Sequence, residues 1–184
     1  NDVNIIVNNE NIHNVKEAEM SLFEPRGGTA LYDAIGKAIE VMTDIYLKHN
    51  KDTINYNYVI MIMTDGEENS SKKYNYTSIH KLMKQQQSIG WDIKFMGTNQ
   101  NAELSGKHLG LNKDNCITFP PTPIGMSTLM RTISDSMDRC RSGEVSSFTQ
   151  DEKNNLSDDY NPIYHTPKLQ MKQPLSMPPK LKRL

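Results

Sequence analysis

Two short stretches of this chain carry residue types that could do chemistry. Gly27-Gly28-Thr29 places a hydroxyl after two glycines, and Thr64-Asp65-Gly66 places a carboxylate after five apolar residues at 59–63. Hard divalent cations such as Mg²⁺ take oxygen ligands, keep several waters and use only one or two carboxylates. Thr29 and Asp65 on neighbouring loops would suit that chemistry. The competing interpretation is that Asp65-Gly66 is an ordinary turn closing a core strand.

The elements around these two stretches explain how they could meet. The continuous apolar run predicts a strand at residues 58–63 that is buried on both faces, as central strands of parallel sheets are. Such sheets bind ligands at the carboxyl ends of their strands, which is where Asp65 falls. Apolar residues at 31, 35, 38, 39, 42 and 45 have helical spacing. Thr29 therefore lies at a helix entrance, where its hydroxyl can cap free amides.

Strands and helices alternate along the rest of the chain. We expect strands at residues 3–7, 58–63, 92–96 and 116–119, and helices from 31 and over 77–89, 102–109 and 125–141. The apolar residues of the last helix, at 126, 129, 130, 133, 137 and 140, form one stripe, so Cys140 is expected to be buried rather than reactive. This rhythm predicts an α/β fold with a mainly parallel sheet.

Composition limits the function classes. The net charge of -1 gives no general attraction to nucleic acid or to anionic membranes, and no apolar run approaches the roughly 20 residues that span a bilayer. No signal-peptide pattern opens the chain. Cys116 and Cys140 lack CxxC spacing, which favours free thiols in a reducing compartment over one disulfide. The five histidines form no HxxxH or HExxH pair, so a zinc site has little support. We expect a cytoplasmic protein.

The character of the chain changes at Gly143. Residues 144–184 contain few apolar residues and much Ser, Asn and Pro, so they cannot bury enough surface to offset the entropy of ordering. The basic residues near the end, with no acid among them, are Lys168, Lys172, Lys180, Lys182 and Arg183. We expect a folded domain over residues 1–142 and a disordered tail over 143–184, whose basic end is either solvated or docks on an acidic partner.

Two motifs together resemble the von Willebrand factor A (vWA) domain family. PRGGTALYDAI at 25–35 is similar to the loop and helix that carry the family's metal-site threonine, and VIMIMTDGEENSS at 59–71 to its fourth strand with the metal-site aspartate. IGWDIKFMGTNQNAELSGKHLGL at 89–111 resembles the fifth strand and its helix. The resemblance covers residues 1–142 and is to compact intracellular vWA proteins of phages, bacteria and large viruses. It implies a Rossmann-like three-layer fold.

The resemblance also implies a site. Thr29 and Asp65 would be ligands of Mg²⁺ or Mn²⁺ in a metal-ion-dependent adhesion site, which in this family accepts a carboxylate from a partner protein. The family's site begins with Asp-x-Ser-x-Ser, which this chain lacks, and Ser-Asp-Asp at 157–159 cannot substitute. Aligned by eye, the chain starts between the family's second and third strands. We therefore expect a piece of a longer protein that lacks the first strand, first helix and second strand.

Two expectations follow from that departure. In the family's sheet order, 3-2-1-4-5-6, the missing parts include an acidic ligand, two hydroxyl ligands and the neighbour of the strand at 58–63. This chain alone should bind Mg²⁺ or Mn²⁺ weakly, and that strand should have an exposed edge.

The local sequence favours an interaction module over an enzyme, because no candidate general base lies near Thr29 or Asp65. The polar residues after Gly66, which are Glu67, Glu68, Asn69, Ser70 and Ser71, are expected to be solvated. One alternative is a degenerate, metal-free scaffold domain. Another is a Mg²⁺-dependent hydrolase, which would need a second carboxylate or a nucleophile at another strand end. The other strand ends, at 97–99 and 120–121, supply neither.

Overall fold

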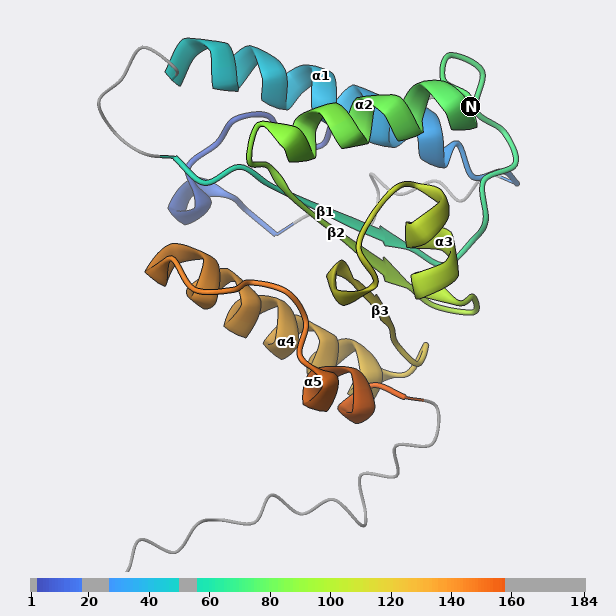
Figure 1. Cartoon of the computed structure of the whole chain (residues 1–184), viewed down its shortest axis with the longest axis vertical. Helices are drawn as coiled ribbons and strands as arrows, with labels where there is room; N and C mark the ends of the chain where they lie inside the picture. The colour runs from blue at the N-terminus through green and yellow to red at the C-terminus, as the bar shows by residue number, and fades with distance from the viewer. Residues whose placement is uncertain (1–2, 18–26, 50–55, 158–184) are drawn as a thin grey trace, which may run out of the picture.

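The computed structural model describes residues 3–17, 27–49 and 56–157 (Figure 1). Its centre is a three-stranded sheet in the order β1-β2-β3, formed by β1 (Val59–Thr64), β2 (Asp92–Gly97) and β3 (Cys116–Thr118). Both strand pairs are parallel, and the β1–β2 register runs from Val59 opposite Asp92 to Thr64 opposite Gly97. The expected α/β class with a parallel sheet is confirmed.

Helices lie on both sides of the sheet, which gives three layers (Figure 1). On one side are α1 (Leu31–His49) and α2 (Tyr76–Ser88); on the other are α4 (Pro123–Ser142) and α5 (Gln150–Asn155). The short α3 (Ala102–His108) lies against β3, and two 3-10 turns, η1 (Ile12–Asn14) and η3 (Lys113–Asn115), complete the elements. This layering is compatible with a Rossmann-like fold.

Alternate strand residues feed two separate cores, as the period of two in a strand requires. Ile60 and Ile62 of β1 join the core under α1 and α2. The core under α4 and α5 is formed by Met96, Ile117, Phe119, Leu129, Phe148 and Leu156. Met61 only packs against the border of this second core, and Met63 at the end of β1 is 42% exposed. The side of β1 that faces α4 is therefore incompletely covered.

Residues 3–7 do not form the expected strand. Their apolar side chains are 36–59% exposed, and every strand pairing in the described part of the chain is among β1, β2 and β3. A short apolar run becomes a strand only where a neighbour supplies ladder hydrogen bonds and a buried face, and this run has neither there.

The chain after α4 also departs from the expectation. Gly143 adopts a left-handed conformation with φ of 76° and ends α4, so the chain turns back along the helix. Phe148 and Leu156 are then 3% and 1% exposed in the second core, and Thr149 and Glu152 form a capping box that begins α5. The predicted domain boundary at 142 is wrong, because residues 144–157, here called the strap, belong to the fold. Residues 158–184, with the basic end, lie outside the described residues.

The predicted stripe of α4 is only partly buried. Its fully buried positions are Gly125, Leu129, Thr132 and Ser136, whereas Met126 and Met130 are 38% and 46% exposed. Cys140 is half-buried rather than buried, and it and Cys116 are both free thiols. The helix turns small polar side chains inward because they serve the strap: the Ser136 hydroxyl donates to the Ser146 carbonyl at 2.6 Å. No helix within the described ranges is long and apolar enough to cross a membrane.

Candidate functional site

The structure brings the loops of Thr29 and Asp65 together at the carboxyl end of β1. The Thr29 N–H donates to Asn69 Oδ1 at 2.8 Å, and the Asn69 N–H donates to the Thr29 carbonyl at 3.1 Å. The Thr29 hydroxyl lies against Gly66, since a Cβ at position 66 would be only 2.9 Å from Thr29 Oγ1. Only glycine fits there without moving the hydroxyl. Thr29 is thus placed beside the residue that follows Asp65.

Asp65 itself is exposed. Among the described residues, no hydrogen bond or ion pair engages its carboxylate, and none engages the Thr29 hydroxyl. The turn beneath Asp65 is held by Thr64, whose hydroxyl donates to the Gly66 carbonyl at 2.8 Å and accepts the Gly66 N–H at 3.2 Å. The strand end is therefore fixed while the carboxylate and hydroxyl keep their lone pairs available.

Glu68 organises the loop instead of being solvated, which corrects the expectation for it. Its carboxylate accepts hydrogen bonds from the Ser70 N–H at 2.8 Å, the Ser71 N–H at 2.7 Å, the Ser71 hydroxyl at 2.7 Å and the Tyr32 N–H at 2.8 Å. The Tyr32 contact ties the loop to the first turn of α1, where an anion is also favoured by the helix dipole. Asn69 is likewise a structural link, through its two bonds to Thr29.

The pKa of Glu68 reflects this network. Partial burial acts to raise it, but the hydrogen bonds donated by Ser71, Tyr32 and Ser70 outweigh burial, and the pKa lies below its ordinary value. The Glu68 carboxylate is thus ionised at neutral pH with its oxygens committed to N–H and O–H donors. It is a poor candidate for a metal ligand or a general base.

Asp33 fixes the far end of the same loop. Its carboxylate accepts the N–H groups of Lys72, Lys73 and Tyr74 at 2.8–2.9 Å. These bonds, the Lys72 bond first, lower the pKa of Asp33 against a smaller opposing effect of desolvation. Two anionic side chains, Glu68 and Asp33, therefore hold residues 68–74 against the start of α1.

A metal ion would find only part of a coordination shell here. Thr29 and Asp65 supply one hydroxyl and one carboxylate, and the described portion of the chain contains no group of three or more His, Cys, Asp or Glu that could hold a metal. Mg²⁺ retains several waters and needs only one or two carboxylates, so the pair suits a partial, weak site. Whether Thr29 and Asp65 bind a metal stays a prediction.

Comparison with known proteins is negative. The chain matches no protein-family model, no curated protein and no solved structure.

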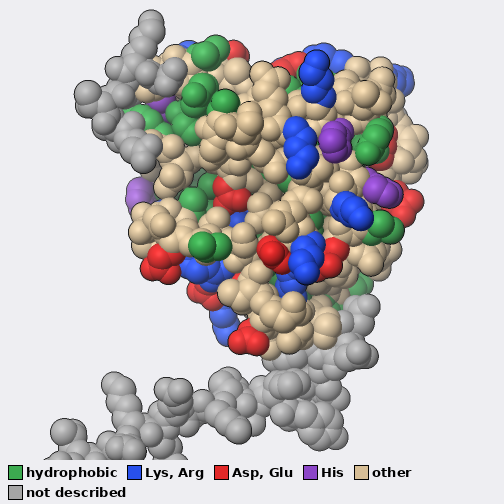
Figure 2. Space-filling view, viewed as in Figure 1, with side chains coloured by type: hydrophobic (Ala, Val, Ile, Leu, Met, Phe, Trp, Pro, Cys, Tyr) green, Lys and Arg blue, Asp and Glu red, His purple; other side chains and the backbone are tan. Residues whose placement is uncertain are grey.

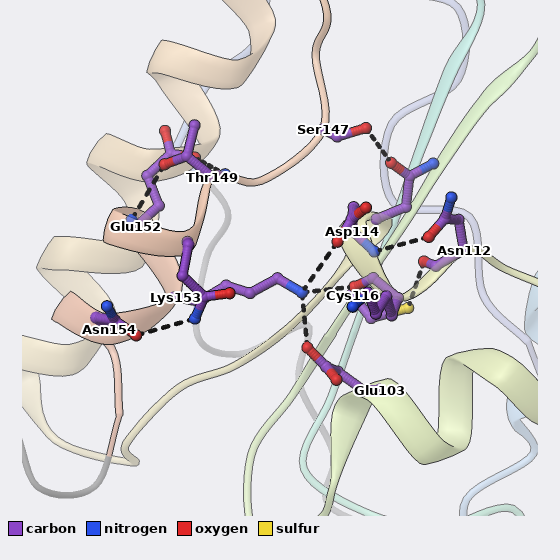
Figure 3. A network of polar contacts seen from close by, with 12 residues as sticks. Glu103, Asn112, Asp114, Cys116, Ser147, Thr149, Glu152, Lys153 and Asn154 are labelled. Atoms are coloured by element: carbon purple, nitrogen blue, oxygen red, sulfur yellow. Dashed lines mark hydrogen bonds and ion pairs between the residues drawn. The ribbon is translucent and has the colours of Figure 1, made fainter.

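A second cluster of ionisable side chains lies at the ends of β2 and β3 (Figure 3). Lys153 of α5, 12% exposed, donates to Glu103 Oε1 at 2.6 Å and to the Lys113 carbonyl at 2.7 Å, with Asp114 at 3.9 Å. The neighbouring Cys116 is buried, and burial raises the pKa of its thiol to about 12. A thiol that stays protonated is not a nucleophile, so this cluster is a structural junction of strap, α3 and η3.

The residue types alone indicated Thr29 and Asp65, whereas the roles of Glu68, Asn69 and Asp33 were missed. A signal for Glu68 was present: serines follow it at two and three positions, which is the spacing at which a carboxylate accepts backbone N–H groups as a helix cap does. No local signal marks Asp33, because its partners lie about forty residues later in the chain.

Proposed function

We propose that this chain is a protein-interaction module of the vWA type, without enzymatic activity. It binds an acidic side chain of a partner protein through Mg²⁺ or Mn²⁺ that Thr29 and Asp65 hold in part. One observation carries the proposal: the two loops are hydrogen-bonded to each other so that the Thr29 hydroxyl lies against Gly66 while the Asp65 carboxylate stays exposed. A divalent ion held there would supply the positive charge that attracts the partner's carboxylate.

The surface supports a protein partner over nucleic acid or membrane. Acidic and basic side chains are mixed over the face seen in Figure 2, and the chain has a net charge of -1. Phosphate backbones and anionic lipids are bound by concentrated basic surfaces. We place the module in the cytoplasm, since its two cysteines are free thiols as in a reducing compartment.

The incomplete ligand set favours one alternative, a metal-free scaffold, over the other. A hydrolase would need a base or nucleophile near Asp65. Glu68 is committed to hydrogen-bond donors, and Cys116 is a protonated thiol with a pKa of about 12. Only a measurement of metal binding separates the interaction module from the scaffold.

The test is a Mn²⁺ titration of the ¹⁵N-labelled chain, followed by paramagnetic broadening of amide resonances. We expect broadening at residues 27–29 and 64–66 at millimolar Mn²⁺, its loss in Asp65→Asn, and its retention in the control Asp135→Asn, which removes an exposed carboxylate from α4. No broadening, or broadening that Asp65→Asn leaves unchanged, would overturn the proposal in favour of the scaffold. Tight, stoichiometric binding would instead contradict the partial ligand set.

A further inference from the structure

We infer that the partner segment bound at Asp65 carries a large apolar side chain beside its acidic residue, and that this side chain enters a cavity between β1 and the start of α4. The acidic part of this inference rests on the proposed function. The apolar part rests on the cavity itself.

The cavity opens directly beside the candidate site. Its volume is about 710 Å³, and it is lined by Met63, Thr64, Asp65, Thr98, Phe119, Pro121, Thr122, Pro123 and Met126. Pockets of roughly 300–1,000 Å³ with apolar walls and a few polar groups are the usual form of ligand sites. Because Asp65 belongs both to the strand-end loop and to the lining, a ligand held at this carboxylate continues into the cavity.

The walls are apolar and unusually open. Met63 at the end of β1 and Met126 in the first turns of α4 are 42% and 38% exposed, although both border the second core. Met130, one turn further along the same side of α4, is 46% exposed. Methionine is flexible and polarizable, and it is common at surfaces that adapt to a bound side chain. Exposed apolar residues gathered around a cavity mark a binding surface rather than scattered surface hydrophobics.

Thr98 gives the lining a polar group with no internal partner. This residue is 4% exposed, and its hydroxyl oxygen makes no hydrogen bond among the described residues. Buried hydroxyls are almost always paired, so an unpaired one in a cavity wall is an unusual feature. A main-chain carbonyl or N–H of a bound segment is the natural partner for it.

The charge at the cavity mouth selects an acidic neighbour for the apolar group. The first turn of the 20-residue helix α4 lines the cavity through Pro123 and contains no acidic residue. The amino terminus of a helix carries partial positive charge, which favours an anion nearby. This field adds to that of a divalent ion at Asp65, so both favour a carboxylate on the partner next to the group that fills the cavity.

The inference is tested with small probes and the ε-¹³CH₃ methionine signals of the full chain in Mg²⁺. The probes are N-acetyl-Asp-Leu-amide, N-acetyl-Asp-Ala-amide and N-acetyl-Asn-Leu-amide, and the Met63 and Met126 signals are assigned with Met63→Leu and Met126→Leu. We expect the Asp-Leu probe to shift both signals with a dissociation constant about tenfold lower than that of the Asp-Ala probe, because its extra carbons leave water.

The three probes separate the two parts of the claim. Equal binding of the Asp-Leu and Asp-Ala probes, or no shift of either methionine by any probe, overturns the cavity inference. Equal binding of the Asn-Leu and Asp-Leu probes leaves the cavity standing and overturns the carboxylate function.

A pair of variants then locates the binding. Met126→Lys should abolish the advantage of the Asp-Leu probe, whereas Ile89→Lys adds the same charge at an exposed position after α2 and should leave it intact. An advantage that survives in a folded Met126→Lys variant overturns the assignment to this cavity. Should Met126→Lys not fold, nuclear Overhauser contacts between the leucine methyls of the probe and Met63 in the unaltered chain decide the location: their presence supports the cavity and their absence overturns it.

Discussion

Glu68 is the residue on which the loop at the candidate site depends, because one carboxylate serves donors from two segments of the chain. Three of its hydrogen bonds close the loop at Ser70 and Ser71, and the fourth reaches Tyr32 in α1. Glu67, its neighbour, is exposed and has no hydrogen bond within the described residues. The two glutamates therefore form a matched pair for mutagenesis.

Replacing Glu68 with Gln should lower the free energy of unfolding by about 2 kcal/mol. The variant loses charge-assisted hydrogen bonds, and its amide NH₂ faces backbone donors. Urea denaturation at pH 7 measures the change, with Glu67→Gln as the control, which should lie within about 0.5 kcal/mol of the unaltered chain. Equal stability of the two variants would show that the loop does not depend on Glu68.

Acid should weaken the fold through the same residues. The pKa values of Glu68 and Asp33 are lowered in the folded state, so each carboxylate contributes stability above its unfolded pKa. That stability is lost as the pH falls from the ordinary value of 4.5 for Glu68, or 3.8 for Asp33, through the lower folded value. Unfolding free energies measured between pH 6 and pH 3 should fall, and less steeply in Glu68→Gln. An identical slope in that variant would exclude Glu68 as a cause.

Residue types predicted from sequence which groups could act, and they failed where a group acts through distant neighbours. Thr29 and Asp65 stood out because a hydroxyl and a carboxylate each flank an element end. Glu68 looked solvated because its sequence neighbours are polar, yet its burial comes from Tyr32, 36 positions earlier. Hydrogen bonds across such separations have no signature in a local window.

Among the elements, β2 and the strap are joined by a buried lysine. The Lys94 side chain is 0% exposed, lies 3.0 Å from Asp92 Oδ2, and donates to the Ser146 carbonyl at 2.8 Å. Ser146 in turn donates from its hydroxyl to Asp92 at 2.6 Å. Arg139 of α4 adds a two-pronged pair with Glu152, at 2.9 and 3.1 Å. The strap is thus held by charges on both the sheet and α4.

Replacing Lys94 with Met should cost about 3 kcal/mol of stability, since it leaves the Asp92 carboxylate largely buried without its cation. The strap should loosen first. Its Phe148 N–H, which donates to the Asp114 carbonyl at 2.8 Å, should exchange with deuterium faster than in the unaltered chain. The control is Lys81→Met on the exposed side of α2. Unchanged Phe148 exchange in Lys94→Met would show that the strap is held by its apolar residues alone.

Periodicity predicted the long elements well, because an amphipathic stripe over a dozen residues is a strong signal that any core satisfies. The structure places α1, α2, α4 and all three strands within a few residues of their expected bounds. The strand at 3–7 failed, since a strand exists only with a neighbour. The strap failed for the opposite reason: two buried side chains, Phe148 and Leu156, lie eight positions apart and form no pattern.

The whole molecule is a sheet with one well-covered face and one partly open face. Two long helices, α1 and α2, cover the first; α4 and the strap cover the second over β2 and β3, and leave β1 more open. The strap is therefore part of the minimum folding unit, because it supplies about half of the cover on its side.

Truncation tests this boundary. A chain that ends at Ser157 should keep the stability of the unaltered chain, whereas one that ends at Ser142 should lose about 4 kcal/mol, from the burial of Phe148 and Leu156. Thermal unfolding followed by circular dichroism gives both values. Equal stability of the two truncated chains would restore the boundary at 142.

The open edge predicts self-association. Within the described residues β1 pairs only with β2, so its other edge presents free ladder groups beside the exposed Met63. Light scattering should show mass rising with concentration, and Met63→Lys should suppress the rise. Ile12→Lys, at a 77% exposed position in η1, is the control and should not. A monodisperse monomer at high concentration would contradict the open edge.

The enclosure of Lys94 makes its amine a chemical clock for the strap. Reagents that acylate lysine modify accessible amines at once, while an amine with 0% exposure reacts only after its cover has lifted. Each lifting of the strap gives the reagent a brief chance to leave a permanent mark. The fraction of molecules marked at this one lysine after a fixed time, read as added mass, would therefore count the openings of a segment that lies 52 residues away in sequence.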